Sequence, residues 1–351
     1  MTAQRKELRK PIALDLFSGC GGLTLGLKQA GFEVLAAVEL DPLAADTYRS
    51  NHRDVMLKEA DIRAVSPLRL RRELNLQKGE LDLLAGCPPC QGFSSLRTRN
   101  GSARNRDRRN DLVDQMLRFA KTFEPKTIMM ENVPKLIEYG PFKRLCNQLA
   151  DLGYMVDVQI KDAARYGVPQ RRRRLILLAG KGFSVPFARE ARRARTVRSA
   201  IGDLREPGES KDPLHDLPEK TRNEKVQKLI RDIPKDGGSR NDLPDSRQLP
   251  CHRKSNGFRD IYGRMAWDSV SPTITGGCFN PSKGRFLHPV RDRAITMREA
   301  ALLQTFPKRY RFSPAAGKEA IALMIGNALP PEFIRRQGIA VLRSLRSLEV
   351  G

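Results

Sequence analysis

Short, almost wholly apolar runs alternate with longer amphipathic stretches in the first half of the chain. The apolar runs occupy residues 12–17, 34–38, 81–85, 127–130 and 175–179. Each has the length of a buried strand, and stretches such as 42–50 have helical patterning. Strands that are apolar on both faces must be covered by helices on both sides. The alternation therefore predicts an α/β fold with a doubly wound, mostly parallel sheet.

The alternation of strand and helix patterns stops near Gly182, which predicts a second region with a different type of structure. Residues 183–297 are richer in Pro, Gly, Arg and Asp and have no long helical pattern. Helical patterning returns near residue 296, and the stretch from residue 318 is apolar enough to pack back onto the sheet. The 351 residues also favour two domains over one. The domains predicted from these shifts are a large one at 1–182 completed by 318–351, a smaller loop-rich one at 183–297, and a connecting segment at 298–317.

Basic residues are in large excess, which predicts a polyanionic partner. Lys and Arg number 64 against 40 Asp and Glu, for a net charge of +24. Residues 161–198 hold twelve Lys or Arg against two acidic residues, and residues 97–118 hold seven Arg against three Asp. Both blocks flank the candidate chemistry described next, so they favour a phosphate-binding cleft over solvated arms.

Membrane insertion and disulfide bonding are not expected. The sequence has no window of eighteen uninterrupted apolar residues, so we expect no membrane span. The six cysteines lie in a long chain without a secretory leader, so reduced intracellular thiols are the better interpretation.

A glycine-rich turn follows the first predicted strand. Residues 15–22 read Asp-Leu-Phe-Ser-Gly-Cys-Gly-Gly, and Glu39 follows at the end of the second strand. Glycines there permit close approach of a ligand, and a carboxylate at that spacing can accept hydrogen bonds from ribose hydroxyls. The pattern fits an adenosine-containing cofactor, with a plain tight turn as the alternative. The spacing differs from Gly-x-Gly-x-x-Gly, which disfavours a nicotinamide cofactor.

Two cysteines follow the third strand, within Gly86-Cys87-Pro88-Pro89-Cys90-Gln91-Gly92. The pair could be a redox dithiol or half of a zinc site, or Cys90 could be a single nucleophile in a mobile loop. No second pair occurs at zinc spacing, and the flanking chain is not thioredoxin-like. Residues 92–110 are rich in Ser, Gly, Asn and Arg, which suits a closing lid.

Charged residues are also predicted at the same sheet edge. Glu131 ends the fourth strand, on the edge that carries Cys90. Before the last apolar run the chain reads Gln170-Arg-Arg-Arg-Arg174. Alternate residues of an extended segment point the same way, so Gln170, Arg172 and Arg174 should share one face.

In this order, the motifs resemble those of the cytosine carbon-5 DNA methyltransferases, of the bacterial restriction-modification or orphan type. The resemblance covers nearly the whole chain and includes Asp61-Ile62 and two later motifs, at 298–307 and 326–331. Leu40 stands where many members carry an aromatic residue against the adenine. Arg171 and Arg173 are additions to the usual Gln-x-Arg-x-Arg spacing.

The resemblance implies a Rossmann-like, S-adenosylmethionine-dependent methyltransferase domain and a target-recognition domain at 183–297. It implies that the Cys90 thiolate adds to carbon 6 of a flipped-out cytosine, so that carbon 5 can attack the methyl donor. Glu131 would stabilise ring nitrogen 3, and Arg172 and Arg174 would hold the base oxygen or a phosphate. The implied cofactor contacts are Phe17, Ser18, Gly19, Gly21, Gly22, Glu39, Leu40, Asp61, Ile62, Pro89 and Asn327. The implied substrate contacts are Gln91, Ser94, Asn132 and Gln170, with no metal.

The implied partner is double-stranded DNA, with a cognate restriction endonuclease acting separately. The expected protein is a cytoplasmic monomer, bound to the nucleoid through DNA and not to a membrane. An RNA cytosine methyltransferase of the same fold is the first alternative, but the chain lacks the Cys-Phe-Thr element usual in that lineage. A non-enzymatic DNA-binding protein is the second, and the intact Cys90, Glu131 and Gln-x-Arg-x-Arg motifs disfavour it.

Overall fold

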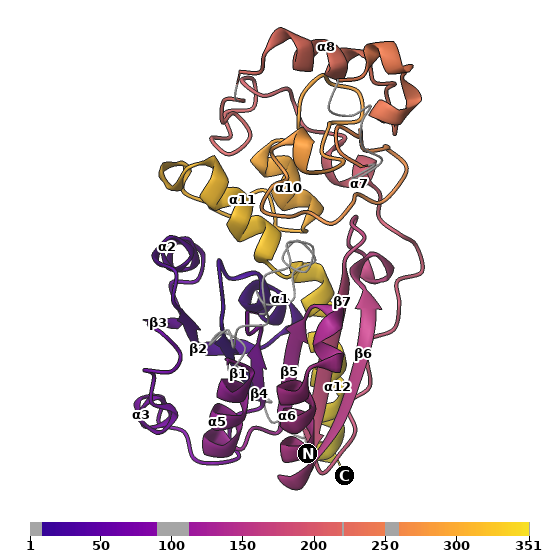
Figure 1. Ribbon diagram of the computed structural model, residues 1–351. Coiled ribbons are helices and arrows are strands. Elements are labelled where there is room, and N and C mark those ends of the chain that lie inside the picture. Colours follow the sequence, from indigo (N-terminus) through magenta and orange to yellow (C-terminus); the bar gives the residue numbers. More distant parts are fainter. Residues whose placement is uncertain (1–8, 90–111, 220, 250–259, 351) are drawn as a thin grey trace, which may run out of the picture.

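The computed structural model describes residues 9–89, 112–219, 221–249 and 260–350. Figure 1 shows a lower tier built on a β-sheet and an upper tier of loops and short helices. The upper tier lies beyond the carboxyl ends of the central parallel strands.

The sheet of the lower tier has seven strands in the order β3-β2-β1-β4-β5-β7-β6. The pairs among β1 to β5 are parallel, whereas β7 is antiparallel to both of its neighbours. The predicted α/β fold with a mostly parallel sheet is confirmed, and each predicted apolar run overlaps one strand. The strands are β1 (Ile12–Leu16), β2 (Glu33–Glu39), β3 (Met56–Glu59), β4 (Leu83–Gly86), β5 (Thr127–Asn132), β6 (Tyr154–Asp162) and β7 (Arg173–Lys181).

The apolar runs do not predict β3 and β6, which are the two edge strands. An edge strand has only one neighbour and is less buried than a central one. Met56 in β3 is 38% exposed and Met155 in β6 is 54% exposed. These strands therefore lack the continuous apolar pattern by which the central strands are recognised.

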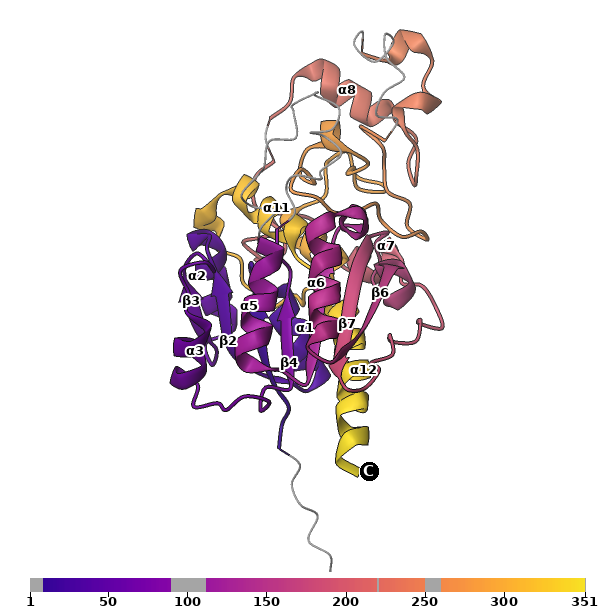
Figure 2. The ribbon, with the colours of Figure 1, turned by 60° about the horizontal axis from the view of Figure 1, so that its bottom comes forward.

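Helices cover both faces of the sheet. α3, α5 and α6 lie on the face turned forward in Figure 2, and α1 packs with α12 on the other. Each face has its own cluster of buried apolar side chains. The helices of this tier are α1 (Gly22–Ala30), α2 (Pro42–Asn51), α3 (Pro67–Glu73), α5 (Val113–Phe123), α6 (Gly140–Asp151) and α12 (Pro331–Val350).

Helix α12 returns from the upper tier and packs along α1. Leu23 and Leu27 of α1 share an apolar cluster with Phe333 and Val341 of α12. The helices approach closely because α1 carries Gly26, where an added Cβ would lie 2.6 Å from both the Ile334 Cβ and the Pro331 carbonyl oxygen. In the part of the chain that the structure describes, no helix is long and apolar enough to cross a membrane.

The upper tier contains little regular structure. A third apolar cluster joins α7, α10 and α11, and a fourth lies beside α8. The upper helices are α7 (Val197–Ile201), α8 (Glu224–Asp232), α10 (Met297–Leu303) and α11 (Lys318–Asn327).

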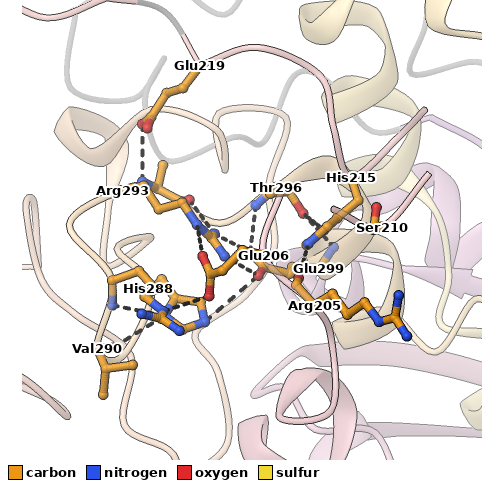
Figure 3. Close-up of polar contacts among 12 residues, drawn as sticks. Arg205, Glu206, Ser210, His215, Glu219, His288, Val290, Arg293, Thr296 and Glu299 are labelled. Carbon is orange, nitrogen blue, oxygen red and sulfur yellow. Dashed lines mark hydrogen bonds and ion pairs between the residues drawn. The ribbon is translucent and has the colours of Figure 1, made fainter. Parts of the chain in front are cut away.

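A buried carboxylate organises the polar core of this tier (Figure 3). Glu299, which is 1% exposed, accepts two hydrogen bonds of 2.8 Å from Arg293. It also accepts from the Thr296 backbone N–H at 2.7 Å and so caps α10. His215 bonds the Thr296 hydroxyl at 2.8 Å and the Arg205 carbonyl at 2.9 Å. These bonds tie the loop before α8 to the first turn of α10 and offset the cost of burying the charge.

Replacing Gly26 by alanine tests the contact between α1 and α12. Gly26→Ala should lower the free energy of unfolding by about 1–3 kcal/mol, because the new methyl group meets atoms that cannot move independently. Gly140→Ala is the control, since its Cβ would meet only the flexible tip of Arg144, at 3.6 Å. Better helix propensity should make that change neutral or stabilising by up to about 1 kcal/mol. Equal stability of the two variants in urea denaturation would contradict the packing described.

Candidate active site

The ends of four parallel strands meet at one edge of the sheet, under the upper tier. The loops after β1, β2, β4 and β5 all start there. This edge is where ligands bind in open α/β sheets. Cys90, Gln91 and Ser94, three of the predicted site residues, lie outside the described residues. Pro89 is the last described residue before them.

The loop after β1, residues 18–22, is here named the cofactor loop. Phe17, Gly19 and Gly21 all have positive φ, at 63°, 55° and 95°. A Cβ on Gly21 would lie 2.6 Å from His52 Nε2, and a Cβ on Gly22 would lie 2.6 Å from the Leu329 carbonyl oxygen. A Cβ on Gly19 would meet no atom within 4 Å. The last two glycines of the loop therefore serve close packing within the protein, and Gly19 faces open space.

Glu39 fastens this loop to the end of β2. One carboxylate oxygen accepts from the Gly19 N–H at 2.7 Å and the other from the Asp41 N–H at 2.8 Å. Burial raises the pKa of Glu39, and these backbone hydrogen bonds oppose the shift. Each oxygen retains a second lone pair, so a ribose hydroxyl can still be bound.

The other predicted cofactor residues border the same place. Leu40 follows Glu39 and is 61% exposed, which is unusual for so large an apolar side chain. Ile62 is buried, while Asp61 accepts from Arg63 at 2.9 Å and 3.0 Å. This ion pair holds the pKa of Asp61 below its usual value.

Asn327 ends α11 and is exposed. Its neighbours along the chain touch the cofactor loop: the Cys20 thiol lies 3.6 Å from the Met324 carbonyl, and Leu329 lies against Gly22. The structure therefore brings the described cofactor candidates from β1, β2, β3 and α11 to one edge.

Glu131 lies at the end of β5 and pairs with Arg174. The Arg174 Nε is 2.8 Å from Glu131 Oε1, and the two side chains are 16% and 9% exposed. Burial raises the pKa of the Glu131 carboxyl, although Arg174 and Arg172 oppose the shift. A carboxyl in this environment holds a proton more readily than an ordinary glutamate.

Asn132 uses its amide within the protein. Its Nδ2 donates to the Pro88 carbonyl at 2.9 Å, and its Oδ1 accepts from the Val133 N–H at 2.8 Å. Asn132 thereby anchors the chain that leads to Cys90. These bonds favour a positioning role, and the predicted substrate contact of Asn132 stays a prediction.

The Gln-x-Arg-x-Arg segment alternates as predicted. Gln170 and Arg172 are buried, at 0% and 3% exposed, and Arg174 is half-buried, whereas Arg171 and Arg173 are exposed. The shared face of Gln170, Arg172 and Arg174 is therefore confirmed.

Gln170 and Arg172, however, bind protein atoms. Gln170 donates to the Gln304 side chain at 2.9 Å and accepts from the Ile274 N–H at 2.9 Å. Arg172 donates to the carbonyls of Ile274, at 3.2 Å, and Gly326, at 3.0 Å. Burial, then repulsion from Arg174, lowers the pKa of Arg172 to about 9. Their hydrogen bonds join the entry of β7 to the upper tier, and the predicted contacts with base or phosphate stay predictions.

Cys87 is a free thiol with a raised pKa. Burial is the main cause, and the nearby carboxyls of Glu131 and Asp15 add to it. A thiol that resists ionisation is a poor nucleophile. Across the described ranges, no group of three or more His, Cys, Asp or Glu residues could hold a metal ion.

Two buried residues beside the cofactor loop carry no sequence signal. His52 hydrogen-bonds Tyr310 at 3.0 Å across a separation of 258 residues. Neither residue belongs to a motif discussed in the sequence analysis. Their proximity could not be predicted from sequence patterns and is known only from the structure.

Open α/β sheets of this kind bind their ligands at the edge just described. Residues 13–342 match the family described as "C-5 cytosine-specific DNA methylase". The Type II methylase M.HgiDII of Herpetosiphon aurantiacus is 35% identical, over 95% of this chain and 96% of its own. The Type II methyltransferase M1.HphI of Haemophilus parahaemolyticus is 34% identical, over 94% of this chain and 86% of its own.

Solved structures show the same fold. A candidate DNA modification methyltransferase encoded within an E. coli prophage superposes with a TM-score of 0.73 and 23% identity, covering 96% of this chain and 99% of its own. The chain belongs to the C-5 cytosine-specific DNA methylase family. The activity predicted from the sequence, methylation of DNA at carbon 5 of cytosine, is confirmed.

Substitution can distinguish the structural role of the buried Arg172 from that of the exposed Arg173. Arg172→Met should lower the free energy of unfolding by about 3 kcal/mol, because it leaves two buried carbonyls without their charged donor. Arg173→Met removes an exposed guanidinium and should change it by less than about 0.5 kcal/mol. Thermal or urea unfolding of both variants measures the difference. If the two were equally stable, Arg172 would not hold the two tiers together.

Proposed function

We propose that this enzyme uses S-adenosylmethionine to methylate a cytosine within a specific duplex DNA sequence, through a covalent adduct of Cys90. The observation that carries the proposal is the buried Glu131 carboxyl, which has a raised pKa and lies at the edge where β4 ends, four residues before Cys90. Addition of a thiolate to carbon 6 puts electrons onto the ring, and a proton-sharing carboxyl at nitrogen 3 stabilises them.

The cofactor loop fits a methyl donor that contains adenosine. Gly19 leaves open space above the loop, and Glu39 keeps lone pairs free for ribose hydroxyls. The exposed Leu40 offers an apolar surface for the adenine, and Asp61 and Asn327 are proposed to contact the donor as well. Phe17, Ser18, Ile62 and Pro89 complete the proposed contacts. S-adenosylmethionine supplies an electrophilic methyl group when bound.

The remaining residues act on the base. Arg174 holds the Glu131 carboxyl in place and is proposed to contact the base oxygen. Asn132 fixes Pro88, two residues before Cys90 in the chain. Gln91 and Ser94, one and four residues after Cys90 in the sequence, are proposed to contact the flipped nucleotide. Arg172 and Gln170 support this site from within the protein.

We further propose that residues 183–297 recognise the target sequence and are joined by 298–317 to a catalytic domain made of 1–182 and 318–351. Within that second stretch, α11 packs with α7 and α10 of the upper tier, and α12 covers the sheet. The relatives M.HgiDII and M1.HphI are named as Type II enzymes, which favours a cognate endonuclease acting separately. A monomer in the cytoplasm, bound to the nucleoid through its basic surface, fits the net charge of +24. Bisulfite sequencing of DNA from cells expressing the chain tests the proposal directly. Modification of tRNA in place of duplex DNA would favour the RNA alternative.

Substitution of Cys90 tests the chemistry. Cys90→Ala should abolish methyl transfer while duplex and cofactor binding persist, because only the nucleophile is lost. Cys87→Ala is the matched control and should keep substantial activity, since the Cys87 thiol resists ionisation. A cofactor-dependent covalent complex with a 5-fluorocytosine duplex should form with the wild type and fail with Cys90→Ala. Equal loss of activity in both variants would instead favour a dithiol.

Exchange of the recognition segment tests the domain assignment. Replacing residues 205–265 by the equivalent segment of a relative should change the methylated sequence, because base contacts each contribute about 1–3 kcal/mol of discrimination. Glu131 and the cofactor loop are untouched, so methyl transfer should survive in a folded chimera. Bisulfite sequencing reads out the target. An active chimera with the original target would place specificity outside this segment.

A further inference from the structure

Two side chains from distant parts of the chain meet beneath the cofactor loop. His52 follows α2, and Tyr310 lies in the segment between α10 and α11; both are 3% exposed. The Tyr310 hydroxyl is 2.5 Å from the Cys20 carbonyl oxygen and 3.0 Å from His52 Nε2. Cys20 is the middle residue of the cofactor loop, so this pair contacts the loop from below.

The donors in this arrangement are determined by the chemistry of the groups. A carbonyl oxygen can only accept, so the phenolic proton of Tyr310 points to Cys20. The hydroxyl oxygen must then accept from His52, which places the imidazole proton on Nε2. Burial, with a smaller effect of Lys28, lowers the pKa of His52 to about 4, so the ring is neutral near pH 7. The chain of hydrogen bonds therefore runs in one direction, from His52 through Tyr310 to the loop.

The pair also fills the space below the loop. Gly21 has φ 95°, and a Cβ there would lie 2.6 Å from His52 Nε2 and 2.7 Å from the Tyr310 hydroxyl. The Tyr310 ring packs on Phe306, with centroids 4.7 Å apart, and on Phe312, at 5.4 Å. A side chain at Gly21 would therefore collide with the pair, whereas a Cβ at Gly19 would meet no atom within 4 Å.

The backbone of Tyr310 is held from the upper tier. Arg298 of α10 donates to the Tyr310 carbonyl at 3.1 Å. The same guanidinium binds Asp212, with Nε 2.5 Å from its carboxylate. Tyr310 is thus fixed at its carbonyl by the upper tier and contacts the cofactor loop through its hydroxyl.

We propose that Tyr310, held in place by the hydrogen bond from His52, is a positioning residue for the methyl donor. It holds the Cys20 carbonyl and so keeps the loop in the positive-φ conformation that leaves Gly19 open. This inference rests on the proposed binding of S-adenosylmethionine at the loop. Tyr310 lies on the protein side of the loop, so its effect on the donor is through Cys20.

Tyr310→Phe removes one oxygen atom and keeps the ring packing. The dissociation constant for S-adenosylhomocysteine, measured by calorimetry without DNA, should rise about fivefold, as expected for one net hydrogen bond. The KM for S-adenosylmethionine should rise by the same factor. kcat at saturating donor should stay within about twofold, because Glu131 and the Cys90 motif are unchanged.

Tyr154→Phe is the matched control. Its hydroxyl also donates to a backbone carbonyl, that of Pro125 at 2.6 Å, and the residue is 4% exposed at the opposite edge of the sheet. Both variants should lose similar thermal stability, but only Tyr310→Phe should bind the ligand more weakly. Equal affinities in the two variants, or a loss of kcat with unchanged KM, would overturn the proposal.

His52 provides a second pair of variants. His52→Gln keeps an N–H that can donate to Tyr310 and should bind S-adenosylhomocysteine within about twofold of the wild type. His52→Leu removes the donor and should weaken binding as Tyr310→Phe does. Wild-type affinity for both His52 variants would overturn the role given to His52. Failure of the wild type itself to bind the ligand would instead refute the proposed function, which separates the two hypotheses.

Discussion

The reversed direction of β7 determines where the catalytic groups meet. β7 runs antiparallel to β5, so its first residues lie beside the last residues of β5, with Leu175 opposite Asn132. Arg174 therefore reaches Glu131, and the residues just before it extend from the sheet into the upper tier. Since alternate residues share a face, Gln170 meets α10, Arg172 meets the end of α11, and Arg174 meets the carboxyl. A parallel β7 would place the same residues at the opposite edge.

The glycines of the cofactor loop are needed for packing within the protein as well as for the approach of a ligand. Gly21 and Gly22 lie against His52, Tyr310 and the Leu329 carbonyl, so side chains at either position would displace neighbouring segments. Only Gly19 faces open space. A loop confined from below and held by Glu39 from the side has little freedom, which reduces the conformational entropy lost when a ligand orders it.

Sequence patterns predicted the central strands, the edge that carries the site, and the family. These follow from local periodicity and from the geometry of parallel strands, which brings Glu39 and Glu131 to one edge without long-range information. The alternation also predicted that Gln170 and Arg172 share one face of the strand. It could not predict which residues of other segments contact that face. That Gln170 meets Gln304, or that His52 meets Tyr310 across 258 residues, depends on tertiary packing. The edge strands were missed because their exposed side chains weaken the apolar signal.

The packing of α1 on α12 has a consequence for synthesis on the ribosome. α1 emerges early, but its partner helix follows about 300 residues later, after the whole upper tier. At about 5–20 residues per second, translation leaves the apolar face of α1 without that partner for roughly 15–60 s. The upper tier is complete before the last helix that covers the sheet has been made. Leu23 and Leu27 therefore lack the contacts of Phe333 and Val341 until α12 has been made, and segments about 300 residues apart must then pack together.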